Sequence, residues 1–222
     1  MMTKLIRNGI AVAALMIVAS AAQAADIPRG NYKAPAYTAP AYANWTGFYD
    51  GLNAGYGFGK SSWEFPAIDT SPKGAVAGLT LGYNYQTGMW LWGAEGDIDY
   101  SGMKGSATCG LNTCETKNSW LGTARARLGY AGWSNWLPYI TGGAAAGNVK
   151  ATNSGFSSAS KTKIGWTAGL GVEYAMWSSW SVKLEYLYVD LGKFDCGISC
   201  GAVADNVSFK ANLVRAGLNY RF

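Results

Sequence analysis

The stretch V-R-A-G-L-N-Y-R-F at residues 214–222, the end of a longer segment over 207–222, decides the fold class. Its apolar side chains are Val214, Ala216, Leu218, Tyr220 and Phe222, and Arg215, Gly217, Asn219 and Arg221 lie between them. This period of two indicates a β-strand with one apolar and one polar face. Nine residues are also enough for a tilted strand to cross a bilayer. The stretch therefore predicts a membrane-crossing strand, although a strand of a soluble sheet could alternate in the same way.

The first 24 residues predict a secretory signal peptide. Lys4 and Arg7 precede an apolar run over residues 9–22, which is too short to span a membrane as a helix. Ala22-Gln23-Ala24 matches a cleavage site, so we expect cleavage after Ala24. The protein is therefore expected to leave the cytoplasm.

Residues 25–44 predict a tether rather than a packed element. Pro28, Pro35 and Pro40 are spaced through an Ala- and Tyr-rich segment, a composition typical of extended chain. The remaining residues, 45–222, are expected to form a single outer-membrane β-barrel domain.

The composition favours a membrane barrel and disfavours several other classes. The chain has 30 Gly, 14% aromatic and only 14% charged residues. Its mean hydropathy is near zero, as expected for strands with one apolar and one polar face. The net charge of +5 falls to +3 without Lys4 and Arg7, which is too weak to indicate nucleic-acid binding. The absence of His removes the commonest general base, so catalysis is not expected.

Strand-like segments alternate with short and long links in a regular order. We predict eight strands, at about 45–58, 74–86, 89–101, 118–131, 137–149, 163–175, 180–190 and 207–222. The links 86–89, 131–137 and 175–180 are short, and the links 59–73, 102–117, 150–162 and 191–206 are long and polar. This order predicts an all-β, eight-stranded antiparallel up-and-down barrel with three short periplasmic turns and four long extracellular loops. A soluble lipocalin-like barrel also has eight strands, so the strand count alone does not decide.

The chemistry of the two strand faces favours the membrane. Along 89–101, one face carries Trp90, Trp92, Ile98 and Tyr100, and the other carries acidic side chains. A soluble barrel would fill its apolar face with branched residues, whereas this face is rich in Trp and Tyr. Near the start of the first strand or the short links lie seven of the ten Trp: Trp45, Trp90, Trp92, Trp133, Trp136, Trp177 and Trp180. These Trp predict an aromatic girdle at one membrane interface.

Several motifs together resemble one known family. They are Trp45-Thr46-Gly47-Phe48-Tyr49, Gly93-Ala94-Glu95-Gly96-Asp97-Ile98-Asp99-Tyr100, Thr123-Ala124-Arg125-Ala126-Arg127-Leu128-Gly129-Tyr130, Pro138-Tyr139-Ile140-Thr141-Gly142-Gly143, Gly169-Leu170-Gly171-Val172-Glu173-Tyr174 and the final Tyr220-Arg221-Phe222. The set resembles the small porin-opacity-type outer-membrane β-barrel proteins of α-proteobacteria, the 25–31 kDa immunogenic outer-membrane proteins. The resemblance implies that the barrel-assembly machinery reads Tyr220 and Phe222 as a carboxyl-terminal signal.

Asp50 departs from this family pattern, because relatives carry an aliphatic residue at that position. By its parity with Phe48 and Leu52, Asp50 is expected to face lipid. A carboxylate there destabilises the barrel to an extent that depends on depth. We therefore expect Asp50 near the periplasmic rim.

Ten charged side chains are predicted to face the lumen. They are Glu95, Asp97, Asp99, Glu173 and Glu185, with Arg125, Arg127, Lys183, Arg215 and Arg221. One interpretation is an ion or proton path, and the other is a salt-bridged plug, which we favour because the interior of an eight-stranded barrel is only wide enough for side chains. The acidic row on 89–101 could also bind calcium, but cationic neighbours on 118–131 make this unfavourable. No metal or other cofactor is therefore expected.

The four cysteines lie in two of the long links. A secreted protein favours disulfides, and we predict two local pairs, Cys109 with Cys114 and Cys196 with Cys200. Two other connectivities, and a zinc site built from all four cysteines, remain alternatives.

These observations predict an integral outer-membrane barrel with a structural and surface-exposed role in envelope integrity, adhesion or antigenicity, and without catalysis. Expected partners are outer-membrane lipid, lipopolysaccharide, the barrel-assembly machinery, and host surfaces or antibodies at the loops. The alternative is a narrow porin or a protein for uptake of a small ligand. Haem uptake is implied by the family resemblance only, and without His the axial ligand would have to be Tyr, Met or Cys.

Overall fold

The computed structural model describes residues 43–63, 68–109, 112–154, 158–177, 179–197 and 205–222. Within these ranges, the side chains of Cys109, residues 194–197 and Asp205 are not described. The predicted signal peptide and all but the last two residues of the predicted tether lie outside these ranges, so both stay predictions. None of the described residues belongs to a helix long and apolar enough to cross a membrane.

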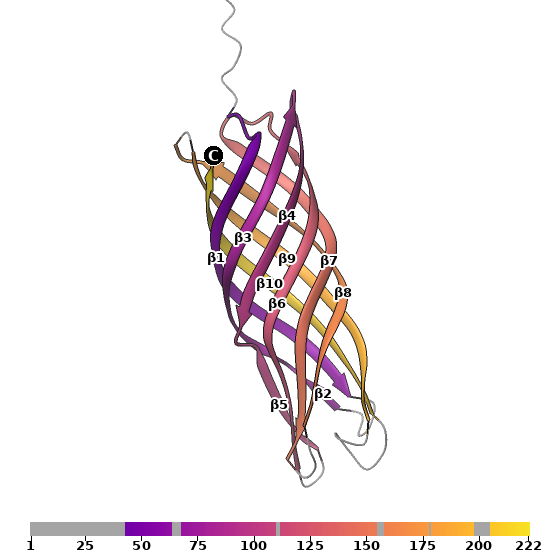
Figure 1. Cartoon of the computed structure of the whole chain (residues 1–222). Helices are drawn as coiled ribbons and strands as arrows, with labels where there is room; N and C mark the ends of the chain where they lie inside the picture. The colour runs from indigo at the N-terminus through magenta and orange to yellow at the C-terminus, as the bar shows by residue number, and fades with distance from the viewer. Residues whose placement is uncertain (1–42, 64–67, 110–111, 155–157, 178, 198–204) are drawn as a thin grey trace, which may run out of the picture. The chain divides into compact units, whose positions relative to one another are not determined.

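Antiparallel strands form a closed ring (Figure 1). The described strands are β1 (Gly47–Trp63), β2 (Ile68–Thr70), β3 (Lys73–Thr87), β4 (Trp90–Ser101), β5 (Lys104–Cys109), β6 (Asn112–Tyr130), β7 (Trp136–Asn153), β8 (Ser158–Ala175), β9 (Trp180–Gly197) and β10 (Asp205–Arg221). Eight of them, all except the short β2 and β5, run in sequence order around the ring. Pairing of β1 with β3 on one side and with β10 on the other closes it, so the predicted eight-stranded ring is confirmed.

The strands are longer than predicted, and this is the main correction to the predicted fold. β1 was expected to end near residue 58 but continues to Trp63, and β7 continues from 149 to Asn153. Much of the predicted long loops at 59–73, 102–117, 150–162 and 191–206 is therefore strand. Their polarity suggested loops. Polar and apolar residues still alternate through these segments, but here the apolar residues face inwards and most polar residues face outwards.

Beyond the ends of β3 and β4, the short strands β2 and β5 take their places. β2 pairs with the last residues of β1, and β5 pairs with the first residues of β6. Together with the extended ends of β1 and β6–β10, they continue the barrel wall on the side away from the short turns (Figure 1). We call this part the outer extension.

Large inward side chains lie over inward glycines on the neighbouring strand. Tyr49 pairs with Gly82, and Tyr139 pairs with Gly171. A Cβ atom on Gly82 would lie 2.3 Å from the Tyr49 ring, and one on Gly171 would lie 2.5 Å from the Tyr139 ring. The glycines therefore make room for aromatic rings inside a narrow barrel, as in other curved sheets.

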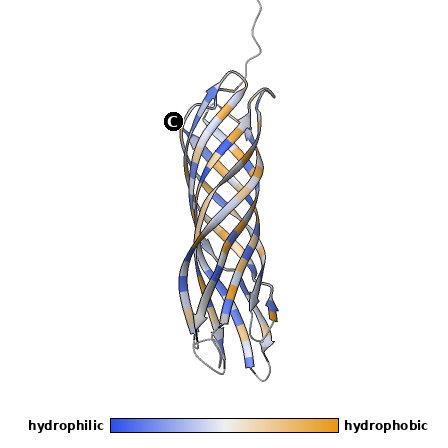
Figure 2. Cartoon of the chain, turned by 90° about the vertical axis from the view of Figure 1, so that its right-hand side faces the viewer, coloured by the Kyte–Doolittle hydropathy of each residue, from blue (hydrophilic) through white to orange (hydrophobic). Residues whose placement is uncertain are grey.

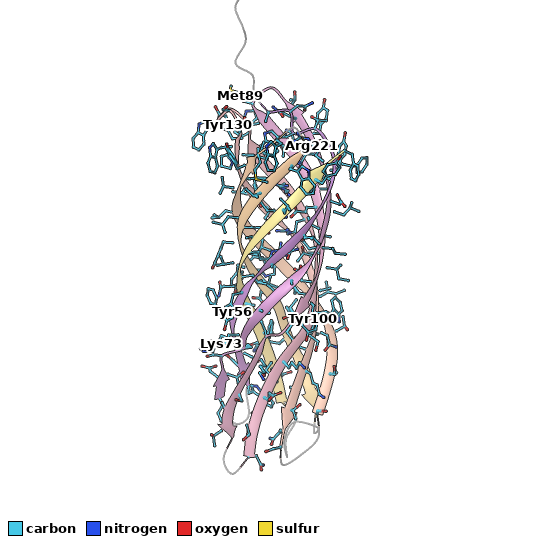
Figure 3. All side chains as sticks on the ribbon, turned by 90° about the vertical axis from the view of Figure 1, so that its left-hand side faces the viewer. Tyr56, Lys73, Met89, Tyr100, Tyr130 and Arg221 are labelled. Carbon is cyan, nitrogen blue, oxygen red and sulfur yellow. The ribbon has the colours of Figure 1, made fainter. Side chains whose placement is uncertain are left out.

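Aromatic side chains form two belts on the outside. The turn-end girdle consists of Phe48, Tyr83, Trp90, Trp92, Trp133, Trp136, Trp177, Trp180 and Tyr220, which are all exposed. The loop-end girdle consists of Tyr56, Phe58, Tyr100, Trp166 and Tyr188. Figure 3 shows Tyr130 and Met89 at one end, and Tyr56 and Tyr100 towards the other. Two belts with apolar residues between them define a membrane-spanning band.

Trp45 is a correction to the predicted girdle. It is 1% exposed and lies inside the barrel end with Leu91 and Leu137, whereas the other six predicted Trp lie outside. The backbone N–H of Trp45 donates to Gln86 Oε1 at 2.9 Å, and the N–H of Gln86 donates to Thr46 Oγ1 at 3.0 Å. These bonds direct the chain across the end of the barrel as it enters β1.

Asp50 faces outwards between Phe48 and Leu52, as predicted from parity. Its direct cross-strand partners are Leu81 and Tyr220, and Tyr220 belongs to the turn-end girdle. The register therefore places the carboxylate at the edge of the apolar band.

Candidate functional site in the barrel lumen

Nine charged side chains fill the part of the lumen inside the membrane-spanning band. They come from β4, β6, β8, β9 and β10, where alternation turns every second residue inwards. We call them the charge layer: Glu95, Asp97, Asp99, Arg125, Arg127, Glu173, Lys183, Glu185 and Arg215. None is more than 7% exposed. The layer holds five carboxylates and four cations, so it is close to charge balance.

Arg125 lies at the centre of the charge layer. It pairs directly across the sheet with Glu95, and its guanidinium donates to that carboxylate. It also donates to Asp97 Oδ2 at 2.6 Å and to Glu185 Oε1 at 2.9 Å. One arginine thus joins carboxylates from both sides of the lumen.

Arg215 joins the same group from β10. Its Nη1 donates to Asp99 Oδ2 at 2.7 Å, and its Nη2 donates to Glu185 Oε2 at 2.5 Å. Asp97 also accepts hydrogen bonds from Thr80 at 2.8 Å and Thr123 at 2.7 Å. Charged and neutral donors together compensate carboxylates that have been removed from water.

Arg127 is held by two aromatic rings as well as by a carboxylate. Its guanidinium donates to Glu173 Oε2 at 2.8 Å and lies 3.9 Å from the centre of the Tyr139 ring. It also donates to the Tyr49 hydroxyl at 2.8 Å, and that hydroxyl donates to Glu95 Oε2 at 2.7 Å. The arrangement combines cation–π contact with charge-assisted hydrogen bonds.

Sequence reasoning did not identify Tyr49 and Tyr139 as members of this network. Both were within quoted motifs, and both have inward parity. The signal that could have found them is the glycine opposite each ring, since an inward tyrosine needs a vacant neighbouring position. Lys183, which was predicted, donates to Glu95 Oε2 at 3.0 Å.

Arg221 lies outside the charge layer, although it was predicted among the lumen charges. It is half-buried at the turn end, with its guanidinium 5.7 Å from the centre of the Trp45 ring. Its parity is inward, but it is one residue from the end of the described chain. Arg221 and Arg215 therefore share the inward parity, but Arg221 lies at the turn end of β10 and Arg215 lies in the charge layer.

The outer extension encloses an apolar core, which was not predicted. We call it the apolar plug; its larger members are Trp63, Val76, Met103, Leu121, Val149, Leu187, Val189, Leu191, Val207, Phe209 and Leu213. All are 2% exposed or less. At the opposite end, Trp45, Leu91, Ala131, Leu137 and Ala175 form a smaller apolar cap. The charge layer thus lies between two apolar layers.

Only part of the cysteine prediction falls on described side chains. Cys114 is buried in the apolar plug and is disulfide-bonded. The side chains of Cys109, Cys196 and Cys200 lie outside the described part of the chain. Both predicted pairs therefore stay predictions.

No cluster of three or more potential metal ligands occurs among the described residues. Glu95, Asp97 and Asp99, weighed above as a calcium site, are each held by an arginine. Each of the three carboxylates thus has at least one oxygen paired with a cation of the protein itself.

The ring of strands, the two girdles and the charged lumen define a small membrane-spanning β-barrel. The chain belongs to the outer membrane protein β-barrel domain family, whose model matches residues 10–222. It is a protein of the bacterial outer membrane.

Two relatives extend over almost the whole chain. The 31 kDa outer-membrane immunogenic protein of Brucella melitensis is 39% identical over 230 residues, covering 92% of this chain and 95% of the relative. The 25 kDa outer-membrane immunogenic protein of Brucella abortus is 34% identical over 215 residues, covering 96% of each. These matches show the family that the sequence motifs indicated.

A solved structure shows the same fold. Neisserial surface protein A superposes with a TM-score of 0.51 and 18% sequence identity, covering 80% of this chain and 98% of that one. At this identity the likeness concerns the fold alone.

Proposed function

We propose that this protein is a non-catalytic, closed structural barrel of the outer membrane, whose outer extension forms a rigid surface outside the cell. The observation that carries the proposal is the lumen, in which a paired charge layer lies between the apolar cap and the apolar plug. The three short turns are proposed to face the periplasm, as in other outer-membrane barrels.

The lumen opposes ion passage in two ways. An ion would have to enter the apolar plug, which is dominated by buried apolar side chains such as Phe209 and Leu213. Buried hydroxyls in this part, such as those of Ser61, Thr70 and Thr116, already hydrogen-bond to one another. Transfer of an unpaired ion into such surroundings is costly. It would then meet side chains already paired with one another, such as Arg215 with Asp99. Movement through the lumen requires rearrangement of both layers.

Single-channel conductance in planar bilayers tests this proposal. The refolded chain is first checked for folding by its heat-modifiable migration on a gel. We expect folded protein to give no discrete current steps. Reproducible steps would contradict the closed lumen and would instead support the narrow-porin alternative.

The outer extension is proposed to be the surface that antibodies or host molecules contact. The Brucella relatives are named immunogenic proteins, which supports exposure of this part in the family. Deleting two residues from each strand at the β7–β8 tip, 152–153 and 158–159, would test this. Antibodies raised against whole cells should bind the shortened variant less, while its folding should be unchanged. A shortened chain that folds and binds these antibodies equally would argue against the proposal at this tip.

A further inference from the structure

Four lysines on four neighbouring strands lie directly opposite one another on the outside of the barrel. Lys73 of β3 pairs with Lys104 of β5, Lys104 pairs with Lys117 of β6, and Lys117 pairs with Lys150 of β7. All four are exposed. We call this set the lysine row.

The lysine row is electrostatically unfavourable without an outside partner. Like charges directly opposite in a sheet lie about 5 Å apart at their Cβ atoms and destabilise the pairing. No carboxylate of the described residues forms an ion pair with any of the four lysines. Glu115, which lies two residues from Lys117 on the same face, forms none either.

A second pair of opposed lysines shows how the same barrel compensates such a contact. Lys60 of β1 lies directly opposite Lys210 of β10. Lys60 forms an ion pair with Asp69 at 2.8 Å, and Lys210 forms one with Asp190 at 3.4 Å. The compensated pair forms ion pairs within the protein, whereas no lysine of the row forms an ion pair among the described residues.

The lysine row begins at the edge of the membrane-spanning band. Lys73 lies directly opposite Phe58, a member of the loop-end girdle. Figure 3 shows Lys73 just beyond Tyr56 and Tyr100, on the side of the outer extension. Aromatic girdles mark the level of lipid headgroups, so the row starts at that level. From there it crosses tilted strands, so its members lie at different heights.

On the membrane side of the row, the outer face of the neighbouring strands is apolar. Ala75, Ala77 and Leu79 of β3 face outwards there, as do Ile98 and Tyr100 of β4. Cations at the edge of an apolar, lipid-facing surface match a molecule with an anionic head and apolar chains.

We propose that the lysine row binds the phosphate groups of an anionic glycolipid in the outer leaflet of the outer membrane, with its acyl chains along the apolar outer face of β3 and β4. The inference rests on the proposed orientation of the outer extension. The start of the row at the level of the lipid headgroups favours a lipid over a soluble polyanion, because Lys73 lies there beside Phe58 of the loop-end girdle.

Titration with bisphosphorylated lipid A in neutral detergent micelles tests the proposal. The Lys104→Gln/Lys117→Gln double variant is compared with the matched Lys60→Gln/Lys210→Gln variant. Each lysine near an anionic lipid surface is worth about 1 kcal/mol, so we expect the first variant to bind lipid A about 30-fold more weakly. The second variant should bind within about 2-fold of the parent chain, because its lysines already have partners.

Stability without lipid gives an independent readout with the opposite sign. In neutral detergent alone, Lys104→Gln/Lys117→Gln should raise the thermal unfolding midpoint, because like charges are removed. With bisphosphorylated lipid A added, the parent chain should gain more stability than the variant. A merely structural role of these lysines would not reverse the order.

Four results would overturn the proposal. The first is equal lipid A binding by the parent and the Lys104→Gln/Lys117→Gln variant. The second is binding of dephosphorylated lipid A by the parent as tightly as bisphosphorylated lipid A. The third is saturable binding of heparin but not lipid A, which would assign the row to a sulfated polysaccharide. The fourth is competition by inorganic phosphate at equal concentration, which would assign the row to free anions. Orientation is checked separately by protease cleavage at the outer extension in intact cells. If the outer extension is not cleaved in intact cells, the proposed orientation is wrong. The conductance experiment tests only the closed lumen, so its result does not alter the interpretation of the lipid A titration.

Discussion

The membrane-spanning band and the outer extension are opposite in polarity, although the same strands build both. In β10, Val214, Ala216 and Leu218 face outwards, and Arg215 faces the charge layer. A few residues earlier, Lys210 faces outwards and Phe209 lies in the apolar plug. Figure 2 shows hydrophilic and hydrophobic segments alternating along the whole length of the strands. The polarities of the inner and outer faces are therefore exchanged at the membrane surface.

This difference shows that the surroundings of the outer face determine which residues fill the lumen. Where lipid covers the barrel, apolar residues face out and a paired charge layer fills the inside. Where water covers it, the strands follow the rule for soluble barrels, with an apolar core. The inversion needs no change of backbone in β10, because the adjacent apolar residues Leu213 and Val214 face opposite sides.

The largest effect is expected from breaking the charge layer. Arg125→Met should lower the free energy of unfolding by about 4 kcal/mol, because Glu95, Asp97 and Glu185 would remain buried without this partner. Urea unfolding in lipid vesicles, followed by Trp fluorescence, measures the change.

Arg221→Met is the matched control for this prediction. Arg221 is half-buried at the turn end, so its replacement should destabilise the barrel less than Arg125→Met. Equal losses would show that the charge layer is not the distinct, tightly paired unit described above.

The apolar plug should respond to loss of volume rather than of charge. Leu213→Ala should cost about 3 kcal/mol, because Leu213 is fully buried and the cavity left behind adds to the lost burial. Leu218→Ala, on the same strand but facing lipid, should cost less than about 1 kcal/mol. The same urea titration compares the two leucines, and a larger loss for Leu218 would contradict the inversion of the barrel.

Most of the barrel ring could be predicted because alternation and short links are local signals. The strand extensions could not, because segments such as 59–63 and 150–153 are polar on their outer face and were interpreted as loops. In β6, a register shift between Asn118 and Leu121 also changes the side that faces inwards: even-numbered residues do so before the shift and odd-numbered residues after it. A phase change within a strand resembles a strand end when only the sequence is considered.

The lumen residues were predictable one by one, but their partners were not. Parity identified Arg125 and Glu185 as inward, yet only the closed ring brings β6 near β9. The lysine row was missed for the same reason, since Lys73 and Lys150 are far apart in sequence and lie in segments interpreted as loops. Contacts across a closed sheet depend on register, which the sequence pattern specifies only within each strand.

A smaller effect is expected at the outer face of the membrane-spanning band. Asp50→Val should raise the free energy of unfolding by about 1 kcal/mol, because an outward carboxylate beside Leu81 and Tyr220 is replaced by an apolar side chain at the edge of the band. Asp50→Asn, which removes the charge but stays polar, should give an intermediate gain. Unfolding in lipid vesicles measures both, and a drop in stability for Asp50→Val would place Asp50 in water rather than at the lipid boundary.

The smallest effect concerns the water-covered face of the outer extension. Lys60 lies 2.8 Å from Asp69, and the Ser62 hydroxyl donates to the same carboxylate at 2.6 Å; these hydrogen bonds lower the pKa of Asp69. A carboxyl whose pKa is lower in the folded state adds stability above its unfolded pKa of about 3.9, and this stability is lost as the pH falls through the lowered value. Asp69→Asn should therefore be less stable than the parent at pH 6, and the difference should disappear in strong acid. Ser62→Ala should also be less stable than the parent at pH 6, but by a smaller margin than Asp69→Asn, because it removes only one of the two hydrogen bonds to the Asp69 carboxylate. Thermal unfolding midpoints across pH measure both variants, and a gap between parent and Asp69→Asn that persists in acid would show that the carboxylate acts through packing rather than charge.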